Sequence, residues 1–260
     1  MSFYVRIAWI ASTILMIAVN TLAITLPINN VSTKQLSDSL STLITPIGWT
    51  FSIWSVIYLG LIIVAIRILY KQINVSRQIT RAYIVSCICN AAWIVAWHYG
   101  YLTSAMLIIV WLLISLIIID QHIQKYEVEH FTSWFRSIFL IYFWRVQIAT
   151  LLMTTIYLIY GLGWITIETL WRPVLVIILT WVSNIFVIYK SRRIETSIVW
   201  LRALTGIYFW QTQPAIQTTC LIVGGTLLIT IAFHLSRHSL STSHPTWLWS
   251  SHDLPNHQSR

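Results

Sequence analysis

One stretch indicates the fold most clearly: Pro46-Ile47-Gly48-Trp49-Thr50-Phe51-Ser52-Ile53-Trp54-Ser55-Val56-Ile57-Tyr58. It opens the second of eight apolar stretches along the chain. Proline is tolerated at the start of a helix, so Pro46 is expected just before a helix over residues 49–70. About 20 apolar residues wound as a helix match the hydrocarbon thickness of a bilayer. The stretch therefore predicts a membrane-spanning helix with aromatic residues gathered at its entry.

The composition extends this prediction to the whole chain. Of the 260 residues, 57% are hydrophobic and 9% are charged, whereas soluble domains contain about 25% charged residues. The apolar runs are continuous and lack the alternation that the strands of a membrane barrel require. We therefore predict an all-α, polytopic membrane helix bundle. The net charge of +9 lies mostly in short connections between spans, so no nucleic-acid partner is expected.

About eight transmembrane helices are expected. Their ranges are 7–26, 49–70, 82–99, 102–119, 138–160, 174–189, 198–210 and 216–235. The first could instead be a cleavable signal peptide, although twenty uncharged residues suit a retained helix better. The seventh is short and contains Arg202, so a re-entrant segment is the alternative there.

The spans divide the chain into three parts: a five-helix membrane bundle over residues 1–165, three further membrane helices over 166–236, and a polar tail over 237–260. With eight crossings, most Lys and Arg residues of the connections fall on one side. Positive residues concentrate on the cytoplasmic side, which places both termini and the tail in the cytoplasm. The expected location is the plasma (inner) membrane.

Several short motifs resemble the tryptophan-rich sensory protein family, also called TspO/MBR or translocator proteins. They are Thr45-Pro46-Ile47-Gly48-Trp49 followed by Phe51, Trp54 and Tyr58; Asn90-Ala91-Ala92-Trp93; and Ala149-Thr150. They resemble elements of that family's second, third and fifth helices, and the resemblance covers roughly Arg6 to Tyr160. The family's usual second proline is Ile47 here, and residues beyond about 170 have no counterpart in five-helix members. The resemblance is that of a long, divergent relative with extra C-terminal helices.

The resemblance implies five helices around a pocket that opens toward one membrane face. It also implies a porphyrin ligand, such as haem or a precursor, or else a sterol or another apolar molecule. Light-dependent porphyrin breakdown is attributed to some members.

The aromatic residues also converge without the family. Trp54 and Tyr58 are four residues apart and share a helix face, as do Asn90, Trp93 and Trp97 at i, i+3 and i+7. An aromatic-lined pocket suits a flat conjugated ligand, although tryptophan is also enriched at membrane interfaces in general. With Arg145, the candidate ligand-binding residues are Pro46, Trp49, Phe51, Trp54, Tyr58, Asn90, Trp93, Trp97 and Arg145.

Arg145 lies in the middle of the fifth expected span, where a cation costs about 2.5–3.5 kcal/mol. All seven acidic residues fall in connections, near span ends or in the tail, so no carboxylate is expected at that depth. Arg145 either bonds helix-end carbonyls, Gln147 or water, or it binds an anionic ligand group. The second reading predicts that Arg145→Leu weakens a carboxylated porphyrin far more than its neutral ester.

The sequence thus predicts an integral membrane ligand-binding, receptor-like protein for a planar tetrapyrrole or an apolar lipid. The alternatives are a transporter of such a ligand and a porphyrin-degrading photo-oxidoreductase. A non-enzymatic role is favoured, because the chain has no nucleophile elbow, phosphate loop or paired acids. We assign no metal and no cofactor beyond a porphyrin ligand. Expected partners are membrane lipids, a porphyrin or sterol-like molecule, and a second copy using the extra helices.

Overall fold

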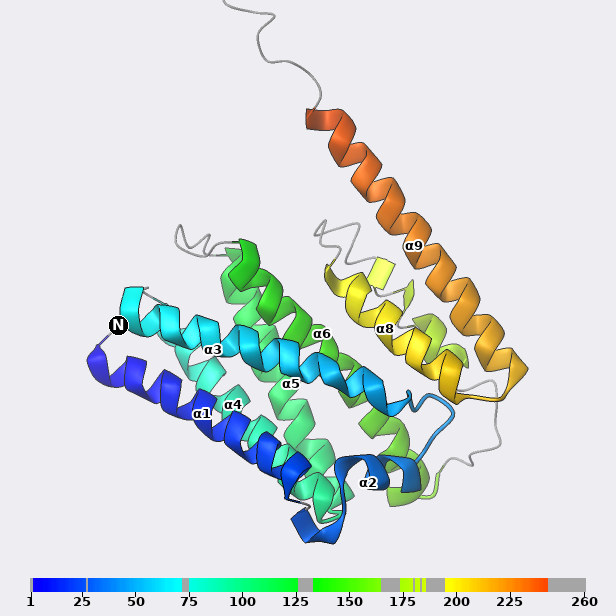
Figure 1. Ribbon diagram of the computed structural model, residues 1–260, viewed down its shortest axis with the longest axis horizontal. Helices are drawn as coiled ribbons and strands as arrows, with labels where there is room; N and C mark the ends of the chain where they lie inside the picture. The colour runs from blue at the N-terminus through cyan, green and yellow to red at the C-terminus, as the bar shows by residue number, and fades with distance from the viewer. Residues whose placement is uncertain are drawn as a thin grey trace, which may run out of the picture.

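The computed structural model describes residues 2–26, 28–71, 75–125, 133–164, 174–179, 181–182, 184–185 and 195–242. The long helices are α1 (Phe3–Thr25), α3 (Ile53–Lys71), α4 (Arg77–His98), α5 (Leu102–Lys125), α6 (Ser133–Ile156), α8 (Glu195–Trp210) and α9 (Pro214–Thr242). Shorter elements are η1 (Ile28–Asn30), α2 (Thr33–Ser39), η2 (Gly48–Ser52) and η3 (Tyr157–Gly161). The described part contains no strand (Figure 1). The predicted all-α class is confirmed.

Six helices among these residues are long and apolar enough to cross a membrane. They are Phe3–Thr25, Gly48–Tyr70, Arg77–His98, Leu102–Lys125, Trp134–Gly161 and Pro214–Phe233. The expected span at 198–210 corresponds to α8, whose 16 residues reach only about 24 Å, less than the roughly 30 Å hydrocarbon core. Of the expected span at 174–189, residues 174–179, 181–182 and 184–185 are described and helical, and the others lie outside the described residues. Within the described residues, six of the about eight expected crossings are therefore present at full length.

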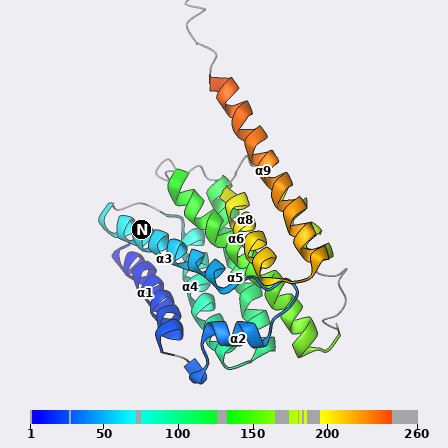
Figure 2. The ribbon, with the colours of Figure 1, turned by 45° about the vertical axis from the view of Figure 1, so that its right-hand side comes forward.

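Five helices form a closed ring. α1 packs between α3 and α4, α4 packs on α5, α5 on α6, and α6 returns to α3 (Figures 1 and 2). α8 packs against the outside of this ring, on α6 and η2, and α9 packs on α8. In both views α9 runs past the end of α8 and away from the ring.

The connection between α4 and α5 shows how short turns set the order of the ring. Gly100 has φ +69°, a left-handed conformation that a residue without a Cβ adopts at little cost. Ser76 caps the other end of α4, where its hydroxyl accepts the Ile79 N–H at 3.2 Å. Because the turn at Gly100 is so short, α4 and α5 must run antiparallel and side by side.

Aromatic stacking joins α1 to α4 in the interior of the ring. The fully buried rings of Trp9 and Tyr83 stack with centroids 3.9 Å apart, and the Thr13 hydroxyl lies 2.8 Å from the Tyr83 hydroxyl. α1 is therefore part of the packed bundle, as the retained-helix interpretation of the first span requires. Elsewhere in the ring, the side chain of Ile138 on α6 fills the space beside Gly60 of α3, so α3 and α6 pack closely there.

Candidate functional site

The aromatic motif that opens the second span folds as a tight turn followed by a helix. In η2 the Thr50 hydroxyl donates to the carbonyl of Ile47 at 2.7 Å, and the Ser52 hydroxyl donates to that of Trp49 at 2.9 Å. Both hydroxyls thus bond the carbonyl three residues earlier, and the Ile47 carbonyl also accepts the Thr50 N–H at 3.1 Å. Pro46 is buried, whereas Trp49 is 44% exposed.

α8 contacts this turn from outside the five-helix ring. Arg202 donates to the carbonyls of Trp49 at 3.1 Å and Thr50 at 3.4 Å, and it also bonds Ser52 Oγ. Its guanidinium lies 4.9 Å from the centre of the Trp49 ring. The Ile47 N–H donates to the Gly206 carbonyl at 3.0 Å. Two of the predicted ligand residues, Pro46 and Trp49, thus lie at a helix-packing contact.

Gln211, directly after α8, adds hydrogen bonds to the loop before the turn. Its side-chain amide donates to the carbonyls of Thr42 at 3.1 Å and Thr45 at 3.2 Å. Sequence reasoning missed Arg202, Gly206 and Gln211 as partners of the motif. The available signal was Arg202 itself, a second arginine inside an apolar segment, where ionisable residues are rare and face the protein interior.

Arg145 is brought together with Phe51 and Trp54. Its side chain is 7% exposed, and its guanidinium carbon lies 5.3 Å from the Phe51 ring centre and 5.4 Å from that of Trp54. Desolvated cation–π contacts are each worth about 2 kcal/mol, so the two rings can offset the insertion cost of about 2.5–3.5 kcal/mol. The two rings do not, however, provide oxygen acceptors for the guanidinium N–H donors.

Throughout the described residues, Arg145 makes no hydrogen bond and no ion pair. The buried Gln147 Oε1, one of the partners expected from the sequence, likewise has no hydrogen-bond partner there. An unsatisfied buried polar group such as this oxygen costs about 1–3 kcal/mol. The arrangement therefore leaves Arg145 as a buried cation with capacity to bind a further acceptor.

The remaining predicted residues form two further groups. Trp54 stacks on Tyr58 with centroids 5.6 Å apart and meets the Tyr142 ring edge-on at 6.0 Å. Trp93 and Trp97 stack on each other along α4 at 6.4 Å. These rings fill space against one another and against the core of the five-helix ring.

Asn90 sits in a polar network that links three helices. It is 1% exposed; its Oδ1 accepts from Asn20 Nδ2 at 2.7 Å and its Nδ2 donates to the Tyr142 hydroxyl at 3.1 Å. Asn20 also donates to the Met16 carbonyl at 2.9 Å. The amide of Asn90 thus holds α1, α4 and α6 together, which was not anticipated from its place in the aromatic stripe.

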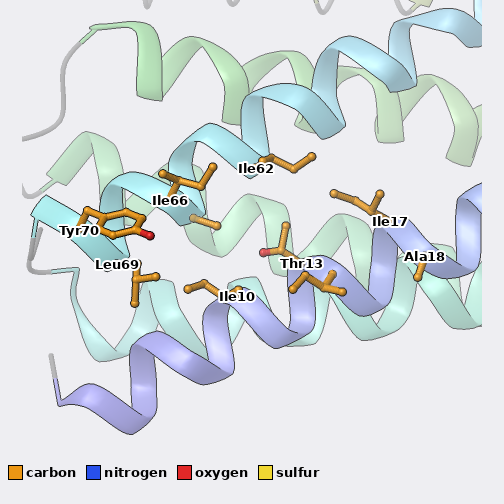
Figure 3. Close-up of a pocket in the computed structure, with 10 residues that line it drawn as sticks. Ile10, Thr13, Ile17, Ala18, Ile62, Ile66, Leu69 and Tyr70 are labelled. Carbon is orange, nitrogen blue, oxygen red and sulfur yellow. The ribbon is translucent and has the colours of Figure 1, made fainter.

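A groove between α1 and α3 is large enough for a small molecule (Figure 3). It has a volume of about 540 Å³. The residues that line it are Ile10, Thr13, Ile14, Ile17, Ala18, Ile62, Ala65, Ile66, Leu69 and Tyr70. None of the nine predicted ligand residues is among them. In the sequence these aliphatic residues cannot be distinguished from residues that face lipid, so no sequence pattern predicted the groove.

A second, much smaller hollow of about 20 Å³ lies where η2, α6 and α8 meet. It is lined by Pro46, Thr50, Ile53, Arg145, Ile148, Val199, Arg202 and Ala203. Two predicted residues, Pro46 and Arg145, contribute to it. The rings of Trp54, Trp93 and Trp97 line neither hollow.

Comparison with known proteins identifies the family of the chain. The family model described as "TSPO-like protein" matches residues 6–233. No curated protein and no solved structure matches the chain. The matched range includes the five-helix ring except the first residues of α1, the whole of α8 and most of α9, so the contacts of α8 with the aromatic turn lie within it.

Proposed function

Because the chain belongs to the TSPO-like protein family and is an integral membrane protein, we propose that it binds an apolar, lipid-like ligand in the groove between α1 and α3. The groove is the observation that carries the proposal. Its volume of about 540 Å³ falls within the range of about 300–1,000 Å³ that is typical of small-molecule sites. Its walls are almost wholly aliphatic, which suits a ligand dissolved in the bilayer.

The few polar atoms of the groove narrow the class of ligand. The Thr13 hydroxyl donates to the Trp9 carbonyl at 2.8 Å and contacts the Tyr83 hydroxyl, so it is already engaged. The Tyr70 hydroxyl stands near one end of the groove (Figure 3). The ten lining residues include no charged side chain. This combination favours an apolar body with at most one weakly polar end, such as a sterol, over a porphyrin diacid.

Filling the groove tests this function. In purified protein, Ala18→Trp should weaken binding of the fluorescent sterol dehydroergosterol at least about tenfold, because the indole would occupy the ligand's volume. Leu107→Trp is the matched control, since Leu107 lies on α5, is 60% exposed and does not line the groove. Fluorescence anisotropy of the sterol gives the Kd of each variant. Equal Kd values for the Ala18→Trp and parent proteins would refute the assignment.

A tetrapyrrole is the second candidate ligand, and the buried Arg145 beside Phe51 and Trp54 is the observation that favours it. A ligand carboxylate would supply the acceptor that the guanidinium lacks. However, the hollow there holds only about 20 Å³, so the macrocycle would have to displace the rings of Phe51 and Trp54. The comparison of a carboxylated porphyrin with its ester in Arg145→Leu tests this candidate, with the exposed Arg67→Leu as control.

Other finer assignments also belong to the proposal. Cytoplasmic termini, the plasma membrane and the three-part division at residues 165 and 236 follow from the charge and hydropathy patterns alone. Transport, light-driven porphyrin breakdown and homodimer formation stay predictions. Measuring sterol flux into sealed vesicles that contain the protein would distinguish transport of the ligand from binding alone.

A further inference from the structure

The small hollow at the junction of η2, α6 and α8 is a site of its own, apart from the α1/α3 groove. We propose that it binds one small monovalent anion of halide size, held by Arg145 with Arg202 as the second positive charge. The inference stands independently of the proposed sterol site, because the two hollows share no lining residue.

The size of the hollow limits what it can hold. Its volume is about 20 Å³, and about 10–15 Å³ is needed for a single water-sized particle. One halide ion therefore fits, whereas a polyatomic anion such as gluconate is too large.

The charges around the hollow select an anion. Arg145 and Arg202 both line it, and none of the described residues that line it is Asp or Glu. Ion pairing normally accompanies the burial of a charge, yet Arg145, a residue that is only 7% exposed, has no hydrogen bond or ion pair within the described ranges. A water molecule could accept from Arg145 but would leave both positive charges uncompensated, whereas a monovalent anion both accepts and compensates.

The two arginines have different roles. Arg202 is anchored, because it already donates to the carbonyls of Trp49 and Thr50. The Thr50 hydroxyl is also committed, since it donates to the Ile47 carbonyl. Arg145 thus supplies the free donors, and Arg202 contributes charge from a fixed position.

A comparison of sodium chloride with sodium gluconate, at equal ionic strength, tests the site in the purified full chain. A ligand that binds only the folded protein raises its stability with concentration. We expect chloride to raise the Tm saturably, by on the order of 3 °C at about ten times its Kd, while gluconate does not. The Arg145→Gln variant should lose this chloride-specific rise. The Arg67→Gln variant should keep it, because Arg67 lies against Trp134 and away from the hollow.

A second variant keeps both charges and removes only the space. Ala203 lines the hollow from α8, so Ala203→Leu should fill it and abolish the chloride effect. Excess broadening of the ³⁵Cl NMR line by the parent protein, lost in Ala203→Leu, would support the site even if Arg145→Gln fails to fold. Identical Tm values in chloride and gluconate for the parent would overturn the proposal, as would a chloride effect that survives both substitutions.

Discussion

Gly206→Leu is expected to lower the free energy of unfolding by about 2–3 kcal/mol, because it pushes α8 off the aromatic turn. A Cβ atom at position 206 would overlap the Thr50 side chain and lie 3.0 Å from the Pro46 Cβ. Thr50 cannot rotate away without losing its bond to the Ile47 carbonyl. Overpacking of this kind costs about 1–3 kcal/mol, and separation would also break the bond from the Ile47 N–H to the Gly206 carbonyl.

Gly225→Leu in α9 is the matched control for this substitution. Apart from the adjoining residues and backbone of α9 itself, no described atom lies within 4 Å of the Cβ position there, and replacing a glycine inside a helix gains up to about 1 kcal/mol. The control should therefore be neutral or slightly stabilising. Circular dichroism during SDS-induced unfolding gives both values. An unfolding free energy for Gly206→Leu within about 0.5 kcal/mol of the parent would mean that α8 does not seat on Pro46 and Thr50.

Asn90→Leu is expected to cost about 1–2 kcal/mol of stability. The substitution removes the acceptor for Asn20 and the donor to Tyr142, and both partners stay buried between α1, α4 and α6. Hydrogen bonds between membrane helices contribute about 0.6 kcal/mol on average and up to about 1.7, and Asn90 makes two. The same SDS unfolding measurement gives the value.

A double-substitution cycle separates this network from simple packing. Because Asn20 and Asn90 share one bond, Asn20→Leu combined with Asn90→Leu should cost less than the sum of the single substitutions. Ser115→Ala is the control, since the buried Ser115 hydroxyl bonds only the Trp111 carbonyl of its own helix, and its loss should be nearly neutral. Strict additivity of Asn20 and Asn90 would show that the bond does not link the helices.

The helical membrane fold could be predicted because its causes are local. Continuous apolar runs of about 20 residues require helix in a bilayer, where each backbone group must be satisfied within its own segment. The spans at 7–26, 49–70, 82–99, 102–119, 138–160 and 216–235 each correspond to a helix of the structure. The weakest expected span, 198–210, corresponds to a helix that is too short for a full crossing.

The site was harder to predict because its contacts join residues far apart in the sequence. The sequence singled out the aromatic turn at residues 46–52, but its partners Arg202 and Gly206 lie at least 150 residues later. Helical spacing placed Trp54 and Tyr58 on one face and Trp93 with Trp97 on another, and both pairs do stack. Spacing within a single helix does not show whether a face encloses a cavity or packs solid.

The groove itself depends on how far α1 and α3 separate near Thr13 and Ile66 (Figure 3), which no local pattern encodes. Photo-crosslinking with a diazirine-bearing sterol, followed by peptide mapping, tests its proposed role most directly. If the groove binds sterol, labels are expected on α1 around residues 10–18 and on α3 around residues 62–70, and excess unlabelled sterol should remove them. Labels spread evenly over the exposed faces of α5 and α9, and unaffected by competitor, would contradict it.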